Sequence, residues 1–151
     1  MTLQISGRIA AGSGAGSSDP ILSKDFKEMT TIVPINPNPD FAPRPGAPAP
    51  DRLIEGNPLF STWAYDDTPA GDTSWSNVLT GVWEATPGLT HSIKGTTLEF
   101  CHILKGRAEI TSVTGESWTF GPGDSFVMKP GFVGTWRTIE TVRKIYVVAQ
   151  A

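Results

Sequence analysis

The sequence predicts an all-β protein, built as a single barrel or sandwich of eight or nine short strands. Its 16 glycines and 13 prolines among 151 residues disfavour long helices, whereas its Trp, Phe and Tyr residues favour strands. From residue 59 onward, runs rich in Val, Ile, Thr, Trp and Phe recur about every 8–12 residues between turn residues, which is typical of a β-sandwich or barrel. No helical segments alternate with these runs, so a parallel α/β sheet is not expected.

The first third of the chain is expected to form an N-terminal arm over residues 1–50, with the barrel over 51–151. Eight of the 13 prolines lie in the arm. Residues 34–50 are the most proline-rich and should be extended, because proline restricts both its own φ and its predecessor. Residues 6–18 are small and cannot form a core of their own. At most one short helix is expected, between residues 19 and 29, with a polar residue at its start.

The barrel strands follow from turn residues that interrupt the apolar runs. Lys105-Gly106 is expected to close a hairpin, Gly115 to lie in the next turn, and Pro130-Gly131 to form another. In chain order, the expected strands are 59–65, 77–86, 89–94, 98–104, 107–113, 117–120, 125–129, 132–138 and 140–148.

Charge and composition exclude several classes of protein. The net charge of −3 and the scattered basic residues argue against nucleic-acid binding. No apolar run reaches the ~18–20 residues of a membrane span, and the first residues lack the apolar core of a secretion signal, so a cytoplasmic protein is expected. Cys101 is the single cysteine, which excludes an intrachain disulfide and a multi-cysteine zinc site.

The order of residues from 81 to 148 resembles the cupin superfamily of small jelly-roll barrels. Glu99 and Gly106, in LEFCHILKG, have the spacing of the first cupin motif, and GPGDSFVMKPG resembles the second. GVWEATPG and the ending GFVGTWRTIETVRKIYVV are similar to the small cupins grouped with the ureidoglycine aminohydrolase cupin domain and the ethanolamine-utilisation Q protein. The resemblance therefore implies a single cupin jelly-roll barrel.

The resemblance also implies a metal site, but its ligand positions depart from the pattern. The two histidines that precede the glutamate in typical cupins fall here on Ser92 and Lys94, or on Ile93 and Gly95, and the third falls near Gly134 or Thr135. The subgroup's shifted ligand set falls on Ile93, Gly95, Glu99 and Thr135. Glu99 alone matches a ligand position, and His91 is a weak candidate one residue out of register. No cofactor is expected, although a weakly bound divalent metal stays open.

Strand alternation assigns the faces around Glu99. If Glu99 points into the barrel, Cys101 and Ile103 do too, whereas Phe100, His102 and Leu104 point outward. In the last strand, Lys144, Tyr146 and Val148 share one face, and Lys144 is the expected partner of Glu99. The two side chains are candidates for a proton-transfer pair, with a structural ion pair as the favoured alternative.

The candidate ligand-binding residues gather around this pair. Cys101 is expected to be a buried, inert thiol, and the sequence leaves open whether Trp83 or Glu84 faces inward. The full set is Glu99, Cys101, Lys144, Tyr146, Trp83, Glu84, His91, Thr135 and Trp136.

The favoured function is a small-molecule-binding barrel with a degenerate metal site. One alternative is a cupin enzyme acting on a small nitrogen-containing metabolite, which the ureidoglycine aminohydrolase resemblance implies. Another is an accessory or structural subunit of a metabolic complex. A homodimer is expected, in which the N-terminal arm docks on the partner's barrel, because the arm has too few large apolar residues for a separate core.

Overall fold

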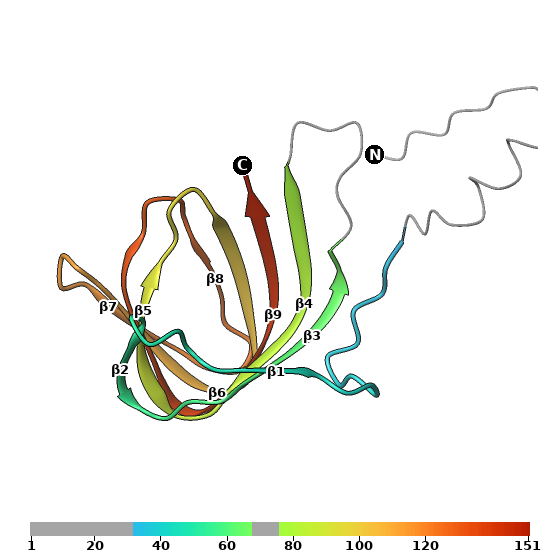
Figure 1. The fold of residues 1–151 in the computed structure, drawn as a ribbon, viewed down its shortest axis with the longest axis horizontal. Coiled ribbons are helices and arrows are strands. Elements are labelled where there is room, and N and C mark those ends of the chain that lie inside the picture. The colour runs from blue at the N-terminus through green and yellow to red at the C-terminus, as the bar shows by residue number, and fades with distance from the viewer. Residues whose placement is uncertain (1–31, 68–75) are drawn as a thin grey trace, which may run out of the picture. The chain divides into compact units, whose positions relative to one another are not determined.

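The computed structural model describes residues 32–67 and 76–151, and Val33–Ala151 form one compact unit. These residues form nine strands, which confirms the all-β prediction (Figure 1). The strands are β1 (Arg44–Gly46), β2 (Leu53–Gly56), β3 (Phe60–Asp66), β4 (Asn77–Ala85), β5 (Gly88–Ile93), β6 (Leu98–Ser112), β7 (Ser117–Phe120), β8 (Ser125–Met128) and β9 (Val133–Gln150).

Two expectations fall on residues outside the described ranges. The short helix expected between residues 19 and 29 and the first part of the arm both lie there. The boundary at residue 50 remains a prediction about the whole chain. The described residues contain no helix, and therefore none able to cross a membrane.

All nine strands belong to one antiparallel sheet that curls on itself. Its main path runs β1-β3-β4-β9-β5-β2, and β6 pairs with β7, β8 and β9. In Figure 1, β5, β7 and β8 lie on one side of the view and β3 and β4 on the other, with β6 and β9 curving between them. The curl arises because β9 is long: its first half pairs with β5, and its second half pairs with β4.

The hairpin predicted at Lys105-Gly106 is wrong, because the chain continues through it as one strand, β6. Gly106 has φ +79°, and the register with β9 shifts between Ile103, Lys105 and Arg107. The irregularity bends β6 instead of reversing it. A Cβ at Gly106 would lie 2.1 Å from the carbonyl oxygen of Thr141, so only glycine allows this close approach.

The separation of strands 132–138 and 140–148 is also wrong, since both lie in β9. The two halves of β6 pair with the two halves of β9. Along its other edge, β6 pairs with two short strands, β8 on its first half and β7 on its second half. Strands β1 and β2 were not expected as strands; β2 pairs with β5 and β1 with β3.

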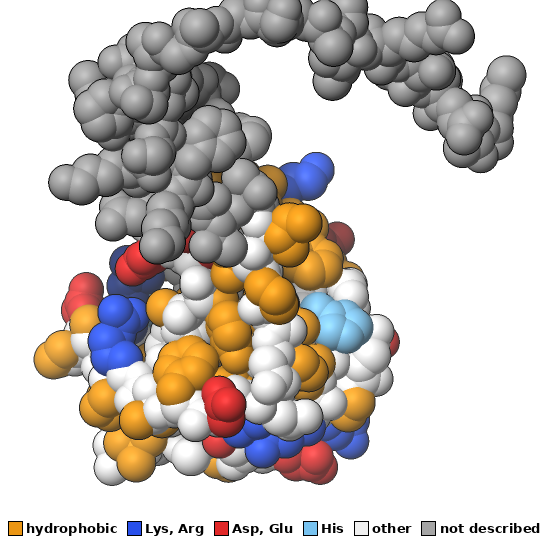
Figure 2. Space-filling view, turned by 90° about the vertical axis from the view of Figure 1, so that its right-hand side faces the viewer, with side chains coloured by type: hydrophobic (Ala, Val, Ile, Leu, Met, Phe, Trp, Pro, Cys, Tyr) orange, Lys and Arg blue, Asp and Glu red, His pale blue; other side chains and the backbone are white. Residues whose placement is uncertain are grey.

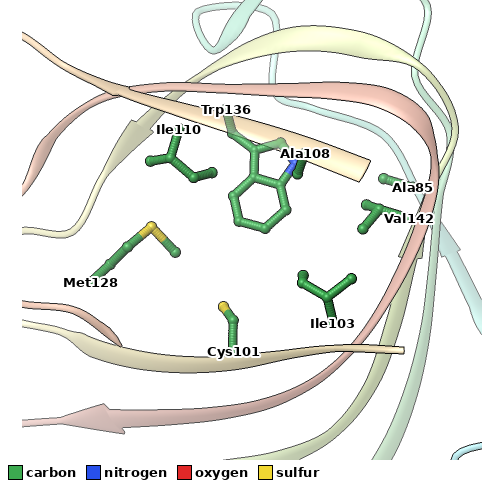
Figure 3. Close-up of a cluster of buried hydrophobic side chains, with 8 residues drawn as sticks. All are labelled: Ala85, Cys101, Ile103, Ala108, Ile110, Met128, Trp136 and Val142. Carbon is green, nitrogen blue, oxygen red and sulfur yellow. The ribbon is translucent and has the colours of Figure 1, made fainter. Parts of the chain in front are cut away.

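The predicted alternation along β6 is confirmed. Glu99, Cys101 and Ile103 are buried, whereas the residues between them are only partly buried. Cys101 and Ile103 belong to the core drawn in Figure 3, in which eight buried side chains pack together inside the curled sheet. The members of this core are Ala85, Cys101, Ile103, Ala108, Ile110, Met128, Trp136 and Val142.

The proline-rich segment before β1 lies against the outer face of β3. The Trp63 indole nitrogen donates to the Phe41 carbonyl oxygen (2.9 Å), and the Tyr65 hydroxyl donates to the Asn36 carbonyl oxygen (3.1 Å). The rings of Phe41 and Tyr65 also meet edge to face, 5.5 Å apart. Because proline has no N–H to offer a sheet, this segment is held through its carbonyl oxygens and one aromatic contact.

Candidate functional site

The inner face of the curled sheet encloses a cavity of about 340 Å³. Strands β3, β4, β5, β6 and β9 all contribute to its lining, together with Arg44 of β1. Six predicted site residues line it: Trp83, His91, Glu99, Trp136, Lys144 and Tyr146. The cavity therefore brings together most of the residues that the sequence analysis selected.

Glu99 lies between two lysines. Its Oε1 accepts a hydrogen bond from the Lys144 Nζ at 2.6 Å, and its Oε2 accepts one from the Lys94 Nζ. The three side chains are largely buried, with exposed fractions of 12% for Glu99, 6% for Lys144 and 15% for Lys94. The predicted pairing of Glu99 with Lys144 is thus confirmed. Lys94, which was not selected as a site residue, completes the cluster.

The two lysines decide the charge of Glu99. Burial by itself raises the pKa of Glu99, but the charges and hydrogen bonds of Lys144 and Lys94 outweigh it and lower the pKa to about 2. Burial likewise works against the charged form of Lys144, whereas Cys101 and Glu99 favour it and raise the pKa of Lys144 overall. Both members of the pair are therefore charged at neutral pH.

Two tryptophan rings surround the Lys144 ammonium. Its Nζ lies 4.5 Å from the ring centroid of Trp83 and 4.4 Å from that of Trp136. The rings meet each other edge to face at 5.8 Å. Cation–π contacts of this kind stabilise a desolvated ammonium. The sequence left open whether Trp83 or Glu84 faces inward; in the structure Trp83 faces the cavity and Glu84 does not.

Cys101, also a predicted ligand-binding residue, lies beside the ion pair but does not line the cavity. Its Sγ donates to Glu99 Oε1 at 3.4 Å and accepts from the Lys144 Nζ at 3.5 Å. Burial and the neighbouring Glu99 carboxylate raise the pKa of the thiol to about 11, despite the opposing charge of Lys144. A neutral, buried thiol is a poor nucleophile, in agreement with the expected inert role.

Glu84 and Thr135, both predicted ligand-binding residues, do not line the cavity. On β4, Glu84 points to the opposite face from Trp83, where its carboxylate accepts from the Arg143 Nε at 2.9 Å and lies 3.1 Å from the Lys105 Nζ. His91 contributes to the lining, but it is an exposed residue of β5. Period-two alternation explains the placements of Glu84 and Thr135, because adjacent strand residues face opposite sides.

A divalent metal does not fit the surroundings of Glu99. Both carboxylate oxygens already accept from ammonium groups, whose charges would repel a cation. The inward positions that precede Glu99 are Ser92, on β5, and Lys94, directly after the end of β5, and neither side chain is an imidazole. Within residues 32–67 and 76–151, no three His, Cys, Asp or Glu side chains are grouped so that they could hold a metal ion.

Two cationic residues of the cavity were missed by sequence reasoning. Lys94 occupies one of the positions where typical cupins have a metal-binding histidine. Because those histidines point into the barrel, the inward direction of Lys94 could have been predicted from the alignment of the motif. Arg44 had no such signal, because it lies in the proline-rich segment, and only the pairing of β1 with β3 brings it to the cavity.

Comparison with known proteins finds a family model that matches part of the chain and solved structures that share its fold. Residues 73–146 match the family model of the EutQ-like cupin domain. No curated protein matches the chain.

Several solved structures share the fold. A protein of unknown function from Pseudomonas syringae, of the DUF861 family, has a TM-score of 0.65 and 24% identity; the match covers 76% of this chain and 46% of that one. This chain thus spans less than half of that protein. The EutQ protein of Clostridium difficile has a TM-score of 0.53 and 18% identity, covering 67% and 77% of the two chains. Ectoine synthase from P. lautus has a TM-score of 0.53 and 16% identity, covering 60% and 64%. Identities this low establish a common architecture only.

Proposed function

We propose that the barrel binds a small organic molecule in the cavity beside Glu99, without a tightly held transition metal. The match of residues 73–146 to the EutQ-like cupin domain and the fold shared with a EutQ protein support a cupin barrel as the setting. The observation that carries this proposal is the Lys144–Glu99–Lys94 cluster at the wall of an open, aromatic-lined cavity. Lys94 and Glu99 occupy positions where typical cupins have metal ligands. In this protein the positive charge at that place comes from the lysine ammonium groups and not from a metal ion.

The cavity has the features of a ligand pocket. Its volume of about 340 Å³ lies at the low end of the range of small-molecule sites, about 300–1,000 Å³. Trp83, Trp136 and Phe60 supply apolar walls, and a few charged groups project among them. Such a combination buries the body of a small molecule while its polar groups are oriented by fixed partners.

Acid–base chemistry by the pair is less well supported than binding. Proton transfer near pH 7 requires Lys144 to release a proton or Glu99 to accept one. The pKa of Lys144 is raised and that of Glu99 is lowered, and both displacements hold the charges in place. These directions favour a structural ion pair that shapes the cavity over a proton-transfer pair.

A ligand screen tests the proposal. Purified protein is screened by ligand-observed NMR against neutral, anionic and cationic metabolites. The matched variant is Thr62→Trp, which places an indole in the cavity from β3, and the control is Thr119→Trp, at an exposed site on β7. We expect hits that Thr62→Trp abolishes and Thr119→Trp retains. An empty screen, or hits that persist in Thr62→Trp, would overturn the proposal.

A further inference from the structure

We infer that this cavity binds a small organic monoanion, a carboxylate attached to an apolar or planar body, and that Lys94 binds its charge. The inference rests on the proposed function and names the chemical class of the ligand. It is carried by the number and position of the charges at the cavity wall.

The Glu99 cluster contains one more positive charge than negative charge. Lys94 and Lys144 are both ion-paired to Glu99, and no other carboxylate among the described residues lies within ion-pair distance of either lysine. All three side chains are at least 85% shielded from water, as their exposed fractions of 15%, 6% and 12% show. Charges in such surroundings are normally paired. One bound carboxylate would supply the missing negative charge.

Lys94, and not Lys144, has donors left for a ligand. An ammonium group has three N–H donors. Those of Lys144 are directed to Glu99 and Cys101, and two indole rings cover the group. The Lys94 Nζ has Glu99 as its only hydrogen-bond partner among the described residues. Lys94 also lines the cavity, so its remaining donors are available there.

The backbone holds Lys94 at a defined position. Its N–H donates to the Phe132 carbonyl oxygen at 2.9 Å, and its own carbonyl oxygen accepts from the Thr97 N–H at 2.9 Å. The next residue, Gly95, has φ +56°, a conformation that glycine adopts readily. A charged donor on a hydrogen-bonded turn is preorganised for an anion, because little backbone freedom is lost when the ligand binds.

The walls of the cavity determine what else the ligand carries. Trp83, Trp136 and Phe60 present aromatic surface, which suits an apolar or planar body. Arg44 lines the same cavity from β1 and forms no ion pair with another described residue. Arg44 is an exposed residue, so water and salt screen its charge. The shielded excess charge is therefore one, which matches a monoanion.

The positive charge of the cavity is local. On the described part of the face shown in Figure 2, acidic and basic side chains lie next to one another along the lower edge, and no broad surface of one sign is present. The chain as a whole has a net charge of −3. An anion is thus attracted by the cavity in particular, and not by a generally basic protein.

A matched control exists on the outer face of the sheet. Glu84 also has two cationic partners, Arg143 and Lys105, but the Lys105 side chain is 53% exposed. Lys105→Met removes one cationic partner of Glu84, which keeps Arg143. Lys94→Met likewise removes one cationic partner of Glu99, which keeps Lys144. The two substitutions change the net charge equally and differ in whether the lysine faces the cavity.

The experiment measures binding of three probes by calorimetry at constant ionic strength. Benzoate is the test ligand, benzamide its neutral isostere, and phenyl phosphate its more highly charged analogue. The variants are Lys94→Met, Lys94→Arg and Lys105→Met, each checked for native circular dichroism and a single cooperative melting transition above the temperature of the titration. We expect benzoate to bind at least about tenfold tighter than benzamide, as a charge-assisted hydrogen bond implies.

The variants separate a role in binding from a role in folding. Lys94→Met should weaken benzoate binding at least about tenfold and leave benzamide binding unchanged. Lys94→Arg keeps the charge and should retain binding, and Lys105→Met should match the unmodified protein. Equal affinities for benzoate and benzamide, or a Lys94→Met variant that binds benzoate normally, would overturn the role of Lys94. Tighter binding of phenyl phosphate than of benzoate would overturn the monoanion.

Failure of this inference is distinguishable from failure of the proposed function. If the three probes do not bind but the screen finds neutral or cationic ligands that Thr62→Trp abolishes, the cavity binds small molecules and the anion inference is wrong. If neither the probes nor the screened metabolites bind, both are wrong.

Discussion

Glu99 is expected to make the stability of the barrel fall as the medium becomes acidic. Burial, which alone would raise the pKa of Glu99, is outweighed by Lys144 and Lys94, and the pKa is lowered from 4.5 to about 2. A carboxylate whose pKa is depressed in the folded state holds fewer protons there than in the unfolded chain. Its stabilising contribution is therefore complete above pH ~4.5 and is lost as the pH falls towards 2.

The size of the contribution follows from the same pKa. The difference between 4.5 and about 2 corresponds to about 3 kcal/mol at ~1.4 kcal/mol for each tenfold change in the ionisation constant. The Glu99 side chain is only 12% exposed, so solvent screening reduces this value little. Between pH 6 and pH 3, where part of the change occurs, the loss attributable to Glu99 should be about 2 kcal/mol.

Urea unfolding followed by tryptophan fluorescence measures this loss. The free energy of unfolding is determined at pH 6 and pH 3 for the unmodified protein and for Glu99→Gln, which cannot ionise. Glu116→Gln is the control, because Glu116 is exposed and has no ion pair with a described residue. Other carboxylates titrate in all three proteins, so the quantity of interest is the difference between them. The unmodified protein and the control should lose about 2 kcal/mol more than Glu99→Gln.

One result would refute this reasoning. If Glu99→Gln loses as much stability between pH 6 and pH 3 as the unmodified protein does, Glu99 is not held as a carboxylate between the two lysines in solution. The charge count on which the anion site depends would then be wrong as well.

Four further outcomes are expected. Gly106→Ala should lower the free energy of unfolding by well over ~1 kcal/mol, since its Cβ would collide with the Thr141 carbonyl oxygen; an unchanged urea midpoint would contradict the bend in β6. Cys101 should resist a thiol-specific chromogenic reagent at pH 8 in the folded protein and react in urea, because its pKa is raised to about 11; fast labelling of the folded protein would show an accessible thiolate. After dialysis against manganese, nickel or zinc, the protein should retain far less than one equivalent of metal, and a stoichiometric amount by elemental analysis would show that the ammonium groups do not exclude a cation. Deletion of residues 1–30 is expected to lower the melting temperature or shift a homodimer towards monomer, and unchanged light scattering and melting would count against the docking arm.

The faces of the residues in the first half of β6 could be predicted from the sequence. The alternation that places Glu99, Cys101 and Ile103 inward and pairs Glu99 with Lys144 depends only on the period of two and on one correctly placed motif. The resemblance to cupins, which that motif carries in part, also implied the cupin barrel. Strand alternation is a local property, and the motif is a known order of residues. Neither requires knowledge of which strands are neighbours in the sheet.

The continuity of the long strands could not be predicted in this way. Lys105-Gly106 has the composition of a turn, yet β6 continues through it. The reason is that β9 lies alongside both halves of β6 and pairs with each of them. Local propensity is weak compared with the pairing of a whole strand, so the outcome depends on the sheet.

The sequence by itself determined the all-β architecture, the inward side of β6, and the shortage of metal ligands. Only the tertiary structure decided that Trp83 and not Glu84 faces the cavity, that β1 brings Arg44 to its lining, and that Lys94 reaches Glu99. The physical reason is that charge balance depends on distances between strands far apart in the chain, and long lysine side chains have several acceptors within reach. Which acceptor each lysine meets is settled only when β5, β6 and β9 curl around one cavity.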